Sequence, residues 1–158
     1  MAALVPTMDQ VLNATVSELM GASLPGPIAH YEDRLPNEWE AIRPLVDVSG
    51  TADMWWIDAV RRPFQGPATG EIYGIYDVTV RYVCTRADGE EEWSRQARFN
   101  LELAATEIED NDAIFAIGGQ QPLYTNKTTE HSGDFVRREG SKYWAGSVKF
   151  SVEARRWS

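Results

Sequence analysis

Hydrophobic and polar residues alternate most regularly over Glu71–Thr85, EIYGIYDVTVRYVCT. One set of alternate positions, from Ile72 to Cys84, is uncharged and mostly apolar, whereas the set from Tyr73 to Thr85 mixes polar and apolar groups. A period of two with one apolar side is typical of a strand that buries one face. The segment is also rich in Val, Ile, Tyr and Thr, which favour strands. The pattern predicts the central strand of a sheet.

Other segments carry strand patterns of different strength. Trp144–Arg155 alternates cleanly, and it is expected to pair with the central strand or its neighbour. Met54–Val60 is strongly apolar and aromatic, and it is expected to form an antiparallel pair with the central strand. Weaker signals lie at Leu45–Val48, which is a strand candidate, and at Ile28–Tyr31, which reads as an edge segment.

Two helices are predicted. Thr7 to Gln10 has the form of a capping box, because Thr7 can accept from an amide three residues on and Gln10 can reach back. Apolar residues at helical spacing follow it, so a helix is expected over about 8–21. A second stripe predicts a helix over about 90–110, with a core-facing side of Trp93, Ala97, Leu101, Ala104 and Ile108.

The segment Gln120–Lys142 is polar and long for a loop inside a compact domain. It is expected to form a long loop or a hairpin extension, with strand pieces at Leu123–Thr125 and Phe135–Arg138. A short apolar run, Ala113–Ile117, precedes it. The order of elements predicts an α+β fold, in which two main helices pack on an antiparallel or mixed β-sheet, in a single domain over residues 1–158.

Net charge, cysteine content and the length of apolar stretches argue against some classes of protein. The formal net charge of −9 is unlike that of a protein that grips nucleic acid by its phosphates, although an acidic wall can repel DNA in a channel. From composition alone, solubility is the preferred explanation of the same charge. The one cysteine, Cys84, excludes an intramolecular disulfide, and we expect it to be a small buried hydrophobe. No stretch approaches the length of an apolar membrane span.

A search for chemistry finds no catalytic, cofactor-binding or metal-binding set. His30 and His131 are far apart in the chain, and neither has a second histidine or cysteine at ligand spacing. The run Glu90 to Glu92 is explained by the preference for negative charge at a helix N-terminus. No nucleophile or phosphate-binding motif is present. We therefore expect no enzyme activity and no cofactor.

Arginine pairs and tryptophans are the candidates for contacts between subunits. Members of an arginine pair within a strand point to opposite faces, so the pairs do not build one basic patch. Salt bridges between subunits and plain solvation explain the arginine pairs equally well. Trp is often used at interfaces, although a place in or near the core is the simpler explanation for the tryptophans. The candidate contact residues are Trp55, Arg61, Arg62, Arg137, Arg138, Arg155 and Trp157.

The chain resembles the tail terminator, or tail completion, proteins of long-tailed bacteriophages. The resemblance is one of pattern over nearly the whole chain. It rests on an amphipathic helix (Met8–Met20), an extended segment (Ile28–Pro36), a long strand (Ile72–Thr85) that leads into an acidic-headed helix (Glu90–Asp110), the run Ala113–Gly119, and a terminal strand (Gly146–Ala154).

The resemblance implies a structural virion protein of the tail or neck, assembled in the cytoplasm of the host bacterium. Such a protein forms a ring, usually a hexamer, that caps the tail tube and stops its polymerisation. It implies as partners further copies of the chain, the tail tube protein and a head–tail connector, with DNA passing through the lumen without sequence-specific binding. Two alternatives stay open: another neck component, such as a connector or stopper ring, and a small ligand-binding or enzymatic domain in which His30, Tyr31 and the tryptophans line a pocket.

Overall fold

The structure is a computed structural model that describes residues 5–26, 28–30, 52–63, 72–85, 90–127, 130–138 and 141–157. The prediction of a strand at Leu45–Val48 lies outside these residues. The elements in chain order are α1 (Met8–Met20), β1 (Ile28–His30), β2 (Ala52–Arg62), β3 (Ile72–Thr85), α3 (Glu90–Glu109), β4 (Ala113–Phe115), β5 (Pro122–Thr125), β6 (Glu130–Arg138) and β7 (Ser141–Arg155).

β3 is the central strand, as its alternation predicted. It pairs antiparallel with β2 on one side and with β7 on the other, and each pairing runs along most of its length. Along β3, alternate residues from Gly74 to Cys84 are buried, which confirms the predicted buried face. From Tyr82 to Thr85 the residues on both faces are buried. The pairings of β3 with Met54–Val60 and with Trp144–Arg155 are therefore also confirmed.

In the described part of the chain the sheet has seven strands. Six of them follow the order β1-β2-β3-β7-β5-β4, and β6 pairs with the first half of β7. Only β1 and β2 are parallel among the described pairs, so the sheet is mixed. β1 lies at one edge, as expected for Ile28–Tyr31. The Ala113–Ile117 run supplies β4 at the opposite edge. The fold is α+β, and the described residues form two helices and a mainly antiparallel sheet.

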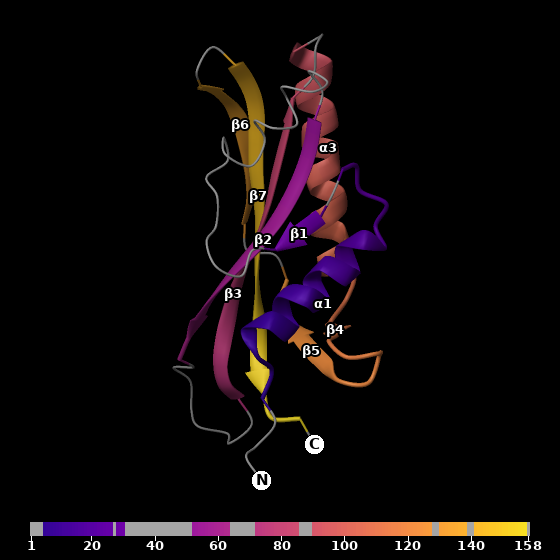
Figure 1. Cartoon of the computed structure of the whole chain (residues 1–158), viewed down its shortest axis with the longest axis vertical. Helices are drawn as coiled ribbons and strands as arrows, with labels where there is room; N and C mark the ends of the chain where they lie inside the picture. Colours follow the sequence, from indigo (N-terminus) through magenta and orange to yellow (C-terminus); the bar gives the residue numbers. More distant parts are fainter. Residues whose placement is uncertain are drawn as a thin grey trace.

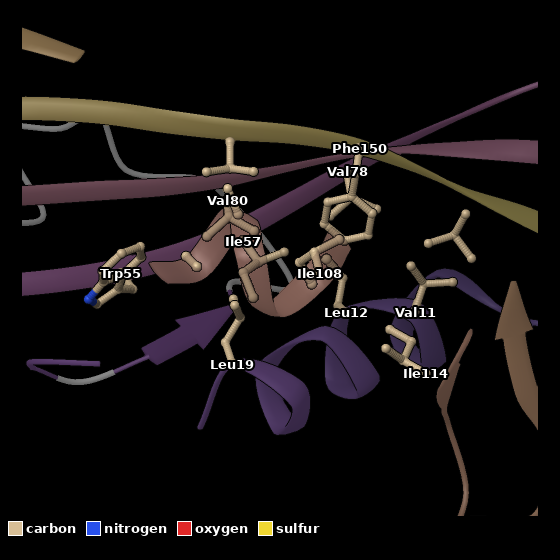
Figure 2. Packing of buried hydrophobic residues seen from close by; sticks show 14 of the residues in the cluster. Val11, Leu12, Leu19, Trp55, Ile57, Val78, Val80, Ile108, Ile114 and Phe150 are labelled. Atoms are coloured by element: carbon tan, nitrogen blue, oxygen red, sulfur yellow. The ribbon is translucent and has the colours of Figure 1, made fainter. Parts of the chain in front are cut away.

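Both helices lie on one face of the sheet (Figure 1). α1 begins with the predicted capping box, in which the Thr7 side chain accepts from the Gln10 amide and the Gln10 side chain accepts from the Thr7 amide. Side chains of α1 and α3, such as Leu19 and Ile108, meet Ile57 and Val80 of the sheet in one hydrophobic core (Figure 2). Both helical stripes point to the sheet because that burial removes their apolar side chains from water.

The polar segment 120–142 contains strands. Leu123–Thr125 falls in β5, and Phe135–Arg138 falls in β6, which starts earlier, at Glu130. β6 and β7 form an antiparallel hairpin, so the segment 120–142 supplies one strand of a hairpin whose other strand lies mostly after Lys142. The sequence Glu130–Asp134 lacks apolar alternation. Among the described strands β6 is hydrogen-bonded only to β7, and residues 132–134 are exposed, so they need no apolar side.

Two glycines in this hairpin make room for a buried indole. Gly133 of β6 and Gly146 of β7 are direct partners in the register, and both point toward Trp144. A Cβ atom on Gly146 would lie 2.6 Å from Cη2 of that ring. Trp144 is 1% exposed and lies 6.0 Å, between ring centroids, from Tyr82 in the core. Both positions therefore require glycine, because the backbone there approaches the Trp144 ring too closely for a Cβ atom.

Candidate functional site

The second face of the sheet separates into a buried half and an exposed half. Residues opposite one another on neighbouring strands share a face, so the register assigns a face to each paired position. Near the start of β2, Trp56, Val83 and Tyr143 on this face are 1–2% exposed. Near the end of β2 the same face is open, with Val60 68% and Tyr73 45% exposed.

We call this second region the open half-face. It crosses β2, β3, β7, β5 and β4, and its strands bring together residues from positions 60 to 155 of the chain. Large apolar or aromatic side chains alternate on it with arginines and carboxylates. The pairings place on it Val60, Arg62, Ile75, Asp77, Phe115, Tyr124, Ser151, Glu153 and Arg155. The exposed Tyr73 lies at a register irregularity between Ile72 and Gly74, and alternation from Ile75 assigns it to the same side.

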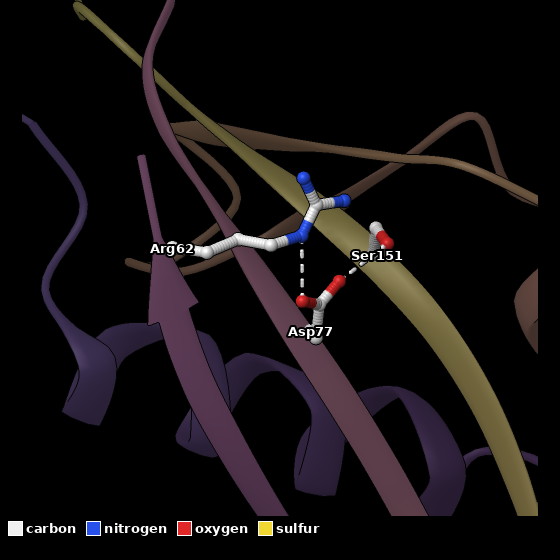
Figure 3. Close-up of polar contacts among 3 residues, drawn as sticks. All are labelled: Arg62, Asp77 and Ser151. Atoms are coloured by element: carbon white, nitrogen blue, oxygen red, sulfur yellow. Dashed lines mark hydrogen bonds and ion pairs between the residues drawn. The ribbon is translucent and has the colours of Figure 1, made fainter. Parts of the chain in front are cut away.

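An ion pair spans β2 and β3 on the open half-face. Nε of Arg62 lies 2.7 Å from Oδ2 of Asp77, and the Ser151 hydroxyl donates to the other carboxylate oxygen at 3.1 Å (Figure 3). The three side chains come from three neighbouring strands and point to the same side of the sheet (Figure 3). Arg62 and Asp77 are each about half exposed. The pair therefore fixes the position of both charges without removing them from the surface.

A second cation lies on the other side of the same region. Arg155 pairs with Glu153, two residues earlier on β7, and its guanidinium carbon lies 4.3 Å from the centre of the Tyr124 ring. That position over the ring face gives a cation–π contact. A Tyr and an Arg held in this way form a rigid, partly apolar surface, and these residue types are enriched at protein interfaces.

Two of the predicted contact residues, Arg62 and Arg155, belong to the open half-face. Arg61 points to the other face, where its guanidinium carbon lies 5.6 Å from the centre of the Tyr76 ring. The expectation that the members of this pair point to opposite faces is confirmed. Arg137 and Arg138 lie in β6, and their side chains are outside the described part of the structure.

Both tryptophans among the candidates are buried within the subunit. Trp55 is 0% exposed, stacks on Tyr82 at 4.1 Å between ring centroids, and donates from Nε1 to the Pro25 carbonyl at 2.8 Å. Trp157 is 9% exposed and donates to the Pro122 carbonyl at 2.8 Å. Neither indole is at the surface to contact a neighbour, so both are removed from the set of contact residues. Their ring area stabilises the core, and each N–H has an acceptor.

Sequence reasoning missed the aromatic part of the open half-face. Tyr73 and Asp77 lie on the mixed side of the central strand, where exposure depends on what covers that side. Phe115 and Tyr124 come from short strands whose neighbours are set by the tertiary fold. The usable signal was that the face of β3 opposite the core contains Tyr73 and Ile75, two large residues on a side with charges.

A buried polar cluster lies on the core face. The Tyr82 hydroxyl donates to the Asp53 carboxylate, and Nδ2 of Asn100 donates to the same hydroxyl at 3.1 Å. Burial is the largest cause that raises the pKa of Tyr82 well above its ordinary value, followed by nearby negative groups. A tyrosine held neutral, with its oxygen already occupied, ties α3 to the sheet and is not available as an acid or base.

A shallow hollow of about 320 Å³ lies over β3, β6 and β7. It is lined by Arg81, Ser132, Gly133, Asp134, Ala145, Gly146 and Ser147. Nε of Arg81 lies 3.5 Å from Oδ2 of Asp58, and Asp134 accepts a hydrogen bond from the Phe135 amide at 2.7 Å. Both charged groups that line the hollow are therefore already engaged by neighbours.

The remaining chemical candidates are not brought together. Cys84 is buried, as expected. His30 lies in β1 and His131 in β6, on opposite sides of the central strand in the strand order, and their side chains are outside the described part. Within the described ranges, no three His, Cys, Asp or Glu residues are grouped so that they could hold a metal ion. No helix in those ranges is long and apolar enough to cross a membrane.

Comparison with known proteins adds no family. No protein-family model matches the chain, and no curated protein matches it.

Proposed function

We propose that this chain is a structural subunit of a bacteriophage tail, a ring-forming tail terminator that caps the tail tube and joins it to the neck. The observation that carries the proposal is the open half-face. Helices cover one side of the sheet, while this region exposes Val60, Tyr73 and Phe115 at 68%, 45% and 53%. Exposed large apolar side chains interspersed with tyrosines and arginines are typical of a surface that a protein buries against another protein.

The identity of the assembly comes from the resemblance. The order of α1, the long strand β3, the acidic-headed α3 and the terminal strand β7 is the pattern on which that resemblance rests. A ring needs a head-to-tail contact whose rotation closes, together with an end surface that recognises the tube. The net charge of −9 fits a lumen through which DNA slides without adhering.

The proposal is tested by adding the purified protein to tail tubes that polymerise from isolated tube protein. Negative-stain images are expected to show shorter tubes with a ring at one end, and light scattering is expected to show ring-sized particles on those tubes. An unrelated acidic protein of similar size is the control for charge. Unchanged tube lengths and bare tube ends would refute the terminator role.

A ligand-binding domain is the second candidate, because of the hollow over β3, β6 and β7. Its polar lining, which includes Ser132 and Ser147, would suit a small polar ligand. A thermal-shift screen of small metabolites tests it, with Ser132→Trp as the variant that fills the hollow. A ligand that stabilises the wild type and not the variant would support this function over the assembly role.

A further inference from the structure

We infer that the open half-face pairs with the open half-face of a second copy of this chain through a two-fold contact. The inference rests on the proposed function in so far as the chain is an assembly subunit. It goes further by naming the surface, its partner and the symmetry. A two-fold contact joins subunits in pairs, so it is additional to the head-to-tail contact that closes a ring.

The first argument is the order of charges across the sheet. Arg62, Ile75 and Glu153 are opposite one another on β2, β3 and β7, so they form one row of cation, apolar residue and anion. Consider a two-fold axis that runs parallel to β3, above Ile75 and between two facing sheets. It places β2 of one copy opposite β7 of the other. Arg62 then faces Glu153 of the second copy, Glu153 faces Arg62 of the second copy, and Ile75 faces itself. One row therefore places a cation opposite an anion twice, around an apolar centre. Within each subunit Arg62 keeps its pair with Asp77, and Glu153 keeps its pair with Arg155.

The neighbouring rows are compatible with the same axis. Tyr73 precedes Ile75 on β3, at a register irregularity between Ile72 and Gly74, and it is 45% exposed. It therefore lies near the axis and close to its own copy, and offset stacking of two tyrosine rings is favourable. In the row on the other side, Val60 faces Ser151. Asp77 faces Asp77, and Arg62 at 2.7 Å within each subunit offsets this repulsion.

The second argument is the local charge balance. The whole chain carries −9, so most parts of its surface repel a second copy. The open half-face carries two arginines, Arg62 and Arg155, and two carboxylates, Asp77 and Glu153, so its formal charge sums to zero. Two copies meet with the least repulsion where this balanced, partly apolar surface faces itself.

The decisive experiment compares matched pairs of exposed apolar residues on the two sides of the molecule. Val60→Lys with Tyr73→Lys puts charge on the open half-face. Phe99→Lys with Met20→Lys puts the same charge on helical residues that are 53% and 67% exposed. Sedimentation equilibrium of the wild type is expected to show a monomer–dimer equilibrium. The first variant is expected to raise the dimer Kd at least about tenfold, and the second is expected to leave it unchanged.

Cross-linking gives a second measurement that does not depend on those variants. Face-to-face sheets lie about 10 Å apart, so a bismaleimide of that span is expected to link Ile75→Cys to its own copy at the axis. Glu102→Cys, which is exposed on α3, is the control and is expected to remain unlinked. The native Cys84 is buried in every variant, which limits its reaction.

Each outcome decides between the proposals. A wild type that stays monomeric at all concentrations, a Val60→Lys/Tyr73→Lys variant with unchanged Kd, or Ile75→Cys that links no more than Glu102→Cys would overturn the inference. Pairing through this face by a protein that never caps tubes would support the inference and refute the terminator role. Capping of tubes by a protein that fails these pairing tests would support the terminator role and overturn the inference.

Discussion

The contact between Trp144 and two glycines predicts whether an alanine at Gly146 lowers or raises the free energy of unfolding. In Gly146→Ala the new Cβ would lie 2.6 and 2.7 Å from Cη2 and Cζ3 of the ring, and 2.9 Å from the Ser132 carbonyl oxygen. Carbon atoms in contact prefer about 3.5–4.0 Å, so the ring must move by about 1 Å. Trp144 is 1% exposed, and a close-packed interior offers little room for that movement.

The expected magnitude follows from two opposing effects. Overpacking a core costs about 1–3 kcal/mol. Alanine lowers the conformational entropy of the unfolded chain and returns about 0.4–1 kcal/mol, because the backbone of Gly146 does not have a positive φ. We therefore expect Gly146→Ala to lower the free energy of unfolding by about 1–2 kcal/mol. Without the close contacts to the ring and to the Ser132 carbonyl oxygen, the same substitution would stabilise the protein.

Urea unfolding monitored by tryptophan fluorescence and by circular dichroism measures this difference. Ser147→Ala, on the next residue of β7 and the other face of the sheet, is the control and is expected to change stability by less than about 0.5 kcal/mol. Trp144→Phe removes the outer part of the indole, so in the double variant the two losses are expected to sum to less than their separate values, with a coupling of at least about 1 kcal/mol. A stabilised Gly146→Ala, or additive losses, would refute the packing argument.

Three further predictions concern the polar groups of the helices and the core. Tyr82→Phe is expected to lower the free energy of unfolding by about 2 kcal/mol, measured in urea, because the buried Asn100 amide loses its acceptor; equal stability would contradict this. Burial, and then the hydrogen bond and charge of Glu107, raise the pKa of Glu18, so its contribution to stability is present at acidic pH and is lost as pH rises through the raised pKa. Glu18→Gln is therefore expected to gain stability over the wild type at neutral pH and not at acidic pH, and an equal difference at both would contradict the assignment. Thr7→Ala is expected to cost about 1 kcal/mol of stability through loss of the capping box, with a lower helix signal in circular dichroism.

Much of the fold could be predicted because its elements have strong local patterns. The alternation in β3 and β7 and the stripes of α1 and α3 each follow from burial of one side of a regular element. For β6 only the part Phe135–Arg138 was predicted as a strand, whereas the strand begins at Glu130. Its first residues are polar and exposed, so they carry no periodic signal, and the strand exists because β7 provides its hydrogen-bonding partner.

The candidate site was predictable only in part, because a contact surface is a property of the assembled sheet. Arg62 and Arg155 were recognised as candidates from their pairs, but they lie 93 positions apart in the chain (155 minus 62). Their arrangement in one region depends on the register of β2, β3 and β7. Trp55 was assigned to a contact because large aromatics suit both interfaces and cores, and local sequence does not distinguish the two.

The sequence by itself determined the type of the main elements, their buried sides, the capping box before α1 and the acidic charge, since each depends on neighbours within a few residues. The tertiary structure alone decided which face of the sheet the helices cover, and hence which large residues remain exposed. A strand with apolar residues on both sides, such as β3 near Tyr73 and Ile75, can be covered on either side or on both. Which side is covered depends on which distant segments pack against it. Those segments compete for the same apolar surface, and only the complete fold determines which of them buries it.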